Sequence, residues 1–394
     1  MALRASKPSF NVREKLTELG RRFGLKGSEL ATAETIQEAR DLVSAGRKNL
    51  IINGDFRVNQ KGGTHTTISG YHLDRWKFQK DGLGQYGHSV TQSSDSPDGF
   101  NNSLRLEVTT TETDLGASED LCLTQHVEGQ NCQALRAGTD SAKPFTLSFW
   151  VKSNKPGTYT SSCTVEQSGT NKIFATTYNI NQASVWEYKV VKFPPCPGVI
   201  ADSTAGELTF RWILNSGSNY TTGTSLHQWS NYASNLFAGG HQTQIMTDGD
   251  IWQITGVQVE VGKNDTDFEY RPIGEELALC QRYYERFSAD CGSGGYATLM
   301  MASKNNNTLI VGQPIFRVPK RASGATFSYG GLLRMHNAAT GSDITISSVQ
   351  NSQLSTHGGY MVLVISNNTM SNGEGFRLEG RNDTSAFIAF SSEL

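Results

Sequence analysis

Residues 145–152 read FTLSFWVK. Apolar side chains occupy every second position of this stretch, and mostly polar ones lie between them. The apolar set is Phe145, Leu147, Phe149 and Val151. Successive side chains of a strand point to opposite faces of its sheet, so this alternation predicts a strand with one buried face, as in an antiparallel sheet.

Similar runs lie on both sides of this stretch. They are short, aromatic and β-branched, and clusters of Gly, Ser, Asn, Asp and Pro separate them, which is typical of strands joined by turns. The runs are NLIINGDF, DRWKF, SLRLEV, IFATTYNI, WEYKVVKF, LTFRWIL and DIWQITGVQVEVG. About ten strands of this kind predict a mainly β fold, in which residues 48–273 form an antiparallel jelly-roll sandwich.

The strand pattern is interrupted near residue 274. The segment IGEELALCQRYYERF has acidic residues near its start, basic residues toward its end, and an apolar face at helical spacing. The apolar face is Leu277, Cys280, Tyr284 and Phe287. We therefore expect a connecting helix over residues 274–291. Short strand-like runs then resume and predict a second, smaller β domain over residues 292–394.

Residues 1–47 have a helical pattern instead. Four apolar residues with 4, 3, 4 spacing form one narrow stripe, namely Val12, Leu16, Leu19 and Phe23. A second short helix follows, with Ile36 on its apolar side. Helices this short are marginal in water, so we expect them to need a partner. The partner is either the chain's own β domain, or sister chains and a host particle, in which case residues 1–47 are an anchor.

Charge and composition exclude several classes of protein. The chain has 35 Lys+Arg and 37 Asp+Glu, a net charge of -2, so it offers no broad positive surface for a nucleic acid. No stretch approaches the roughly 20 apolar residues of a membrane span, and no signal peptide is evident, so we expect a soluble protein outside the secretory route. None of the 6 cysteines has CxxC spacing, and we expect free, reduced thiols.

Catalytic signatures are missing. The sequence contains no GxSxG, HExxH, GxxxxGK[ST] or strand-to-helix GxGxxG pattern, and its histidines lie mostly in polar, loop-like contexts. Glycoside cleavage would need two carboxyl groups about 5 to 10 Å apart. The nearest candidates, Asp248 with Asp250 and Asp265 with Asp267, are typical of turns. We therefore expect no enzyme and no cofactor, and keep a polysaccharide depolymerase as the less favoured alternative.

Glycan binding has some support from aromatic residues in a polar segment. Tyr220, Trp229 and Tyr232 lie in NSGSNYTTGTSLHQWSNYASN, where no strand pattern hides them, and exposed aromatic faces hold neutral sugars. Trp229 fits equally well as a loop residue packed against the edge of the sandwich. A packing role is favoured for the tryptophans in strand runs, which are Trp76, Trp150, Trp212 and Trp252.

Several of these segments, in order and spacing, resemble a known family. NLIINGDFRVNQKG, YHLDRWKF, FTLSFWVKS, WQITGVQVEVG and FEYRPIGEELALCQRYYERF are similar to segments of tail-fibre and minor structural proteins of phages of marine bacteria, including cyanobacteria. The resemblance covers roughly residues 48 to 287, and RPIGEELALCQRYYE is its most specific part. It implies a virion protein, most often a homotrimer, attached to phage tail or head proteins through residues 1–47. The β domains would meet host surface polysaccharide, or the chain would decorate the capsid or tail without binding a receptor.

The central part also resembles the jelly-roll carbohydrate-binding modules of glycoside hydrolases. The opening of those modules is matched at Asn53, Gly54, Asp55 and Phe56. Their closing pair of aspartates is replaced here by Thr255 and Gly256, which puts the structural calcium of those modules in doubt. Asp55 is thus a weak metal candidate, and a turn or cap role is favoured for it.

Overall fold

The structure is a computed structural model. It describes residues 48–66, 69–166, 171–224, 226–288, 296–304, 309–331, 333–336, 343–365, 375–381, 383 and 385–394. The two helices and the apolar stripe expected in residues 1–47 lie outside the described residues. Leu50–Leu394 form one compact unit.

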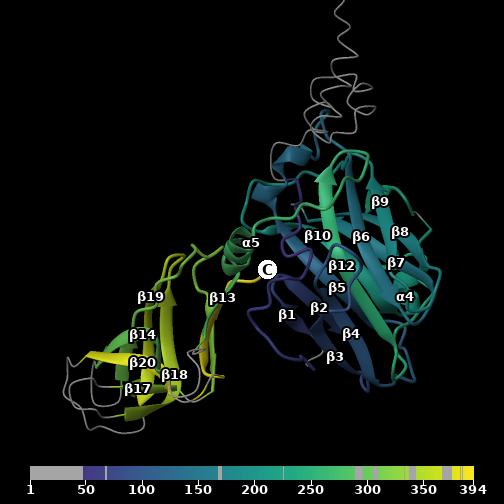
Figure 1. Cartoon of the computed structure of the whole chain (residues 1–394). Coiled ribbons are helices and arrows are strands. Elements are labelled where there is room, and N and C mark those ends of the chain that lie inside the picture. The colour runs from purple at the N-terminus through teal and green to yellow at the C-terminus, as the bar shows by residue number, and fades with distance from the viewer. Residues whose placement is uncertain are drawn as a thin grey trace, which may run out of the picture. The chain divides into compact units, whose positions relative to one another are not determined.

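Two antiparallel sheets pack face to face and confirm the jelly-roll sandwich (Figure 1). The seven-stranded sheet has the order β1 (Gly70–Leu73), β2 (Trp76–Asp81), β5 (Asp120–Glu128), β10 (Gly206–Ser216), β7 (Gly157–Val165), β8 (Lys172–Ile180) and β11 (Trp229–Asn231). The five-stranded sheet has the order β3 (Gly87–Ser93), β4 (Ser103–Thr110), β12 (Ile251–Val261), β6 (Phe145–Ser153) and β9 (Glu187–Phe193).

The core lies between the two sheets. The alternating apolar residues of β6 all point into it, as their spacing predicts, and Trp76, Trp212 and Trp252 are fully buried there. Each such side chain contributes about 1.5 to 3 kcal/mol of burial free energy. Trp150 is an exception to the expected packing role. Its neighbours Phe149 and Val151 face the core, so Trp150 faces outward and is partly exposed.

The helix after the sandwich is shorter than expected. Helix α5 covers Ile273–Gln281, and Tyr284–Ser288 form strand β13, so the prediction of a helix through residue 291 is wrong for this part. Strand β13 pairs antiparallel with β21 (Phe387–Ser391), far along the chain. This long-range pairing overrides the local helical spacing of the segment.

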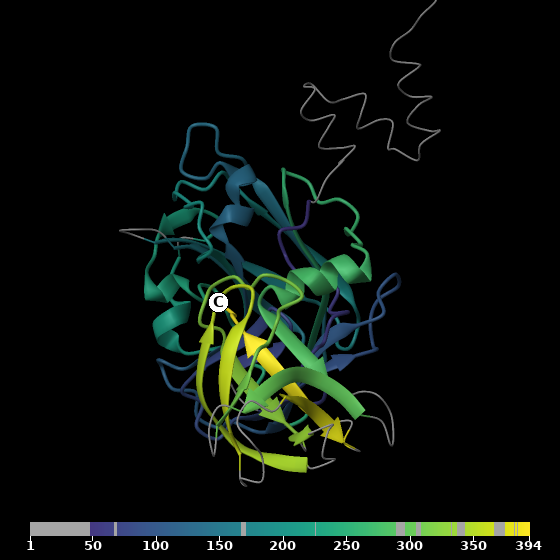
Figure 2. The same ribbon diagram turned by 90° about the vertical axis from the view of Figure 1, so that its left-hand side faces the viewer.

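A second, smaller β body follows, as expected. Its closed barrel has the order β14 (Tyr296–Lys304), β15 (Leu309–Gly312), β19 (Gly359–Ile365), β18 (Asp343–Leu354), β17 (Leu333–His336) and β20 (Gly375–Arg381). A three-stranded sheet of β13, β21 and β16 (Thr326–Gly330) completes it. This body has its own apolar cluster. The division of the chain into independent domains at the expected residues stays a prediction. Leu394 lies against β1 and α5, at the end marked C in Figures 1 and 2.

The described cysteines are buried free thiols, namely Cys122, Cys132, Cys163, Cys196 and Cys280. Burial raises the pKa of Cys132 to about 12 and that of Cys196 to about 11, so both stay protonated at neutral pH. No helix in the described ranges is long and apolar enough to cross a membrane.

Candidate functional site

The residues that carry the family resemblance meet in a buried polar cluster. Asn53 has a left-handed backbone, with φ of 58°, and its side chain closes the local turn: Nδ2 donates to the carbonyl of Val58 at 2.8 Å, and Oδ1 accepts from the N–H of Val58 at 3.0 Å. The N–H of Asn53 donates to Glu276 on α5. The NGDF motif and the RPIGEE motif are therefore in direct contact.

Ion pairs and backbone contacts complete this cluster. Arg271 pairs with Glu276 at 3.3 Å and donates to the carbonyl of Ile51 at 3.0 Å. Asp55, the weak calcium candidate, pairs with Arg57, whose guanidinium also donates to the carbonyl of Arg271 at 2.7 Å. Asp55 thus has a structural role. In the described part of the chain, no group of three His, Cys, Asp or Glu residues could hold a metal ion.

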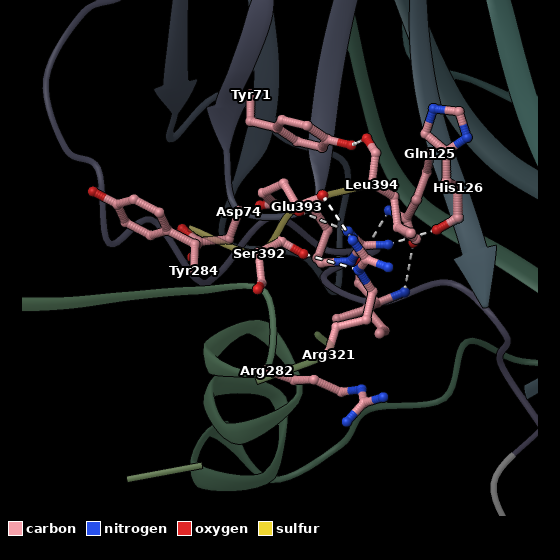
Figure 3. A network of polar contacts seen from close by, with 12 residues as sticks. Tyr71, Asp74, Gln125, His126, Arg282, Tyr284, Arg321, Ser392, Glu393 and Leu394 are labelled. Carbon is pink, nitrogen blue, oxygen red and sulfur yellow. Dashed lines mark hydrogen bonds and ion pairs between the residues drawn. The ribbon is translucent and has the colours of Figure 1, made fainter. Parts of the chain in front are cut away.

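The last residues of the chain form a second polar network, and Figure 3 shows Ser392, Glu393 and Leu394 beside Tyr71 and Arg321. Leu394 also packs against the cluster of Ile52 and Val58, next to Asn53. Arg75 pairs with Glu393 at 2.7 Å, and Arg321 donates to the carbonyl of Ser392 at 2.9 Å. Tyr71 donates to the carbonyl of Leu394. Because Arg75 and Glu393 are almost fully buried, this network stabilises the contact between the sandwich and the second body. It offers no open surface to a ligand.

An open surface lies instead on the outward face of the five-stranded sheet. Five aromatic residues gather there, and we call them the aromatic strip: Phe100, Trp150, Tyr188, Phe268 and Tyr270. Trp150 lies on β6 and Tyr188 on β9, opposite each other in register, with ring centroids 5.3 Å apart. The other three come from the loops before β4 and after β12. Their ring centroids lie 5.0 to 5.7 Å apart.

Gly256 lets the two parts of the aromatic strip meet. It lies at an irregularity in the pairing of β12 with β6 and has φ of +61°. A Cβ atom there would lie 2.6 Å from the ring of Phe100 and 3.1 Å from that of Trp150. Both rings therefore pack over the same glycine. The absence of a Cβ atom at Gly256 leaves room for them.

Hydrogen-bonding groups border the aromatic strip. The hydroxyl of Tyr188 donates to Asp265 at 3.2 Å, and the indole N–H of Trp186 donates to Asp95 at 3.2 Å. Burial raises the pKa of Tyr188 to about 12, so its hydroxyl remains a donor. Burial acts upward on the pKa of Asp95, but the hydrogen bonds from Lys152 and Trp186 outweigh it, and the pKa is lowered. Asp95 is therefore an ionised acceptor at neutral pH.

The aromatic strip is accessible. Tyr188 is 39% exposed and Tyr270 is 54% exposed, and Val190, two residues after Tyr188 on the same face, is 37% exposed. Flat apolar rings bordered by carboxylate, ammonium and hydroxyl groups can hold the apolar face of a sugar ring and bond its hydroxyls.

The three aromatic residues expected to bind glycan lie elsewhere. Trp229 donates to the carbonyl of Pro194 at 2.9 Å and packs partly buried against Phe174, with ring centroids 5.6 Å apart, as its loop-anchor alternative expects. Tyr220 packs on Phe237 with ring centroids 5.6 Å apart, while Tyr232 is 44% exposed. No ring contact among the described residues joins Trp229 to Tyr220 or Tyr232. Their part in glycan binding stays a prediction.

The carboxylate pairs considered for cleavage behave as turn or border residues. Asp250 accepts from the N–H groups of Met246 at 3.0 Å and Thr247 at 2.9 Å, and pairs with Lys155 at 2.8 Å. Asp265 accepts from Tyr188.

Comparison with known proteins gives structural matches alone. No protein-family model and no curated protein sequence matches the chain. A domain of tailspike protein 4 of bacteriophage CBA120, described as enzymatically active, is 15% identical over 54% of this chain and 21% of that one, with a TM-score of 0.31. The CBM22-1–GH10 modules of a Clostridium thermocellum xylanase, complexed with xylohexaose, are 14% identical over 55% of this chain and 29% of that one, with a TM-score of 0.29. A family 11 carbohydrate-binding module of the same organism is 9% identical over 52% of this chain and 98% of that one, with a TM-score of 0.26.

Proposed function

We propose that this chain is a phage virion structural protein, a tail fibre or fibre-like appendage, that binds host surface glycans through the aromatic strip and does not cleave them. The observation that supports binding is the gathering of the partly exposed Trp150 ring and the exposed Tyr188 and Tyr270 rings on one sheet face, with charged and hydroxyl groups at its border. Exposed apolar surface rimmed by polar groups marks interaction sites on soluble proteins.

The virion role is supported by the sequence segments that resemble those of phage fibre proteins. In this proposal residues 1–47 attach the chain to tail or head proteins, and the Val12, Leu16, Leu19 and Phe23 stripe with Ile36 joins sister chains into a homotrimer. The resembling motifs build the buried contact of Asn53 with Glu276, and the Arg75–Glu393 pair adds the end of the chain to this region. This region keeps the two β bodies in contact, as a rigid appendage requires.

Binding is tested by titrating the purified full chain with neutral oligosaccharides, for example xylohexaose, galactotriose and a mixed-linked glucan, and with host surface polysaccharide, by calorimetry. We expect Trp150→Ala and Tyr188→Ala each to weaken binding about tenfold or more, because central aromatic anchors dominate such interfaces. Tyr232→Ala is the matched control, an exposed tyrosine on the other sheet. A loss with Tyr232→Ala and none with Trp150→Ala would move the site to the 220–232 segment.

The absence of cleavage is tested in the same mixtures. We expect no new reducing ends after prolonged incubation, whereas released oligosaccharide would establish a depolymerase.

The virion role is tested by quantitative mass spectrometry of purified particles, with a copy number that is a multiple of three as the expected result. A chain found in particles that binds no glycan would instead be a capsid or tail decoration protein.

A further inference from the structure

The outward face of the seven-stranded sheet holds a buried arginine that forms no ion pair with any described residue. Arg211, on β10, is 9% exposed. Two other buried cations each contact a carboxylate: Arg75 reaches Glu393 at 2.7 Å and Lys320 reaches Glu285 at 2.6 Å. Within the described ranges, no carboxylate lies within 4.0 Å of Arg211. A buried guanidinium that makes no direct ion pair is costly, so its retention favours a ligand that supplies one.

Arg211 also has unused hydrogen-bonding capacity. Its Nη1 donates to the hydroxyl of Thr164 at 2.8 Å, and its guanidinium lies 5.5 Å from the ring centre of Phe237. Its Nε has no hydrogen-bond partner among the described residues. The hydroxyl of Ser162, which is fully buried, likewise has no partner there.

These groups share one row of the sheet. Arg211 is opposite Ser162 on β7 and opposite Thr124 on β5, and Thr124 is opposite Lys77 on β2. Directly opposite residues of antiparallel strands point to the same face, and neighbouring strands lie about 4.8 Å apart. The row from Lys77 to Ser162 therefore places two cations and a free hydroxyl on one face across four strands.

Charges of both signs act on this row, because Asp120, on the same face of β5, interacts electrostatically with Arg211 from beyond ion-pair distance. His126, two positions from Thr124 on β5, has its pKa lowered to about 3 by burial and by the charges of Arg211, Arg75 and Lys77. Its ring is therefore neutral at pH 7 and adds no charge to the row. At the β2 end of the row Lys77 is partly exposed and Gln79 is exposed, and the Lys77 ammonium lies 5.6 Å from the ring centre of Tyr71.

We propose that Arg211, Ser162 and Lys77 form a binding site for an oxyanion, a carboxylate, sulfate or phosphate group, carried by an acidic glycan or free in solution. Arg211 supplies its Nε–H, Ser162 its hydroxyl and Lys77 its ammonium, and charge-assisted bonds of this kind are the strongest available to such groups. The site lies on the sheet opposite to the aromatic strip and does not depend on it.

The test is calorimetric titration of the full chain with sodium glucuronate, sulfate and phosphate at constant ionic strength, with glucose and sodium chloride as blanks. We expect saturable binding of at least one oxyanion and none of the blanks. Arg211→Met, which keeps the apolar stem, should abolish it, and Ser162→Ala and Lys77→Met should each weaken it about fivefold to tenfold. Binding of glucuronate alone identifies an acidic sugar as the source, and binding of all three identifies any oxyanion.

Two variants control for misfolding and for the location of the binding site. Ser162→Ala removes a single oxygen, so it carries the test if Arg211→Met does not fold, as judged by circular dichroism. Trp150→Ala should bind the oxyanion normally, which separates this site from glycan binding at the aromatic strip. The proposal is overturned if no oxyanion saturates the wild-type chain, or if Ser162→Ala and Lys77→Met bind as tightly as wild type.

Discussion

Arg75 and Glu393 are 318 positions apart in the sequence, and their side chains form an ion pair of 2.7 Å in which both are almost fully buried. The guanidinium also lies 3.5 Å from the ring centre of Tyr283, and it donates to the carbonyl of His126 at 2.5 Å. The charge of Glu393 raises the pKa of Arg75 against the effect of burial. One buried cation thus links β2, β5, the end of α5 and the last residues of the chain.

Glu393→Gln should destabilise the protein strongly. It leaves the Arg75 charge buried without its counter-ion, which costs about 3 to 5 kcal/mol of unfolding free energy. The control is Glu107→Gln in the partly exposed Arg105–Glu107 pair, where about 0 to 1 kcal/mol is expected. Urea unfolding measures both. Equal losses of unfolding free energy for the two substitutions would show that the buried pair stabilises the protein no more than the partly exposed pair does.

Gly256→Ala should cost both stability and glycan binding. The added Cβ meets the rings of Phe100 and Trp150 and must also adopt a positive φ, so we expect a loss of about 2 to 3 kcal/mol. Gly249→Ala is the control, because Gly249 has φ of +83° but no atom within 4 Å of its would-be Cβ. We expect about 1 kcal/mol there and unchanged glycan binding. If the two variants behave alike, close packing over Gly256 is not what positions the aromatic strip.

Asp120→Asn should stabilise the protein at high pH and not at low pH. Burial, and then the charge of Asp81 opposite it, raise the pKa of Asp120 to about 7. The folded state therefore binds more protons than the unfolded state between about pH 4 and pH 7, and stability from this group falls as pH rises through that window. The gain from Asp120→Asn should be near zero at pH 4 and about 1 to 3 kcal/mol at pH 8. Unfolding free energies that differ by a constant amount from pH 4 to pH 8 would refute the raised pKa.

Removal of residues 1–47 should abolish incorporation into the virion and leave the β bodies folded. Each body buries its own apolar cluster, whereas a narrow stripe of four apolar residues gains stability mainly against a partner. Copy number per particle and the circular dichroism of the truncated chain measure the two outcomes. Particles that carry the truncated chain at normal copy number would place the attachment in the β bodies.

Mass measurement of the full chain at micromolar concentration tests the trimer, and a monomer would count against it.

The sequence by itself determined the strands and the class of fold. In FTLSFWVK the period of two fixes which side chains face the core, because a strand turns successive side chains to opposite sides. By the same rule Trp150, which lies between the core residues Phe149 and Val151, is on the outward face of the sheet. Its outward position could therefore have been predicted from the sequence. The first two turns of α5 also followed from local spacing.

Tertiary structure decided the rest, because the relevant contacts join distant segments. Tyr284–Ser288 became a strand because β21 supplies its hydrogen bonds, which no local pattern could show. The NGDF and RPIGEE motifs were visible as strings, but only the fold shows that Asn53 meets Glu276. The aromatic strip joins two strands and two loops over Gly256, and only the fold shows that Arg211 makes no direct ion pair with a described carboxylate. Periodicity reports which face a residue occupies, whereas the neighbours it meets on that face depend on how the strands pair.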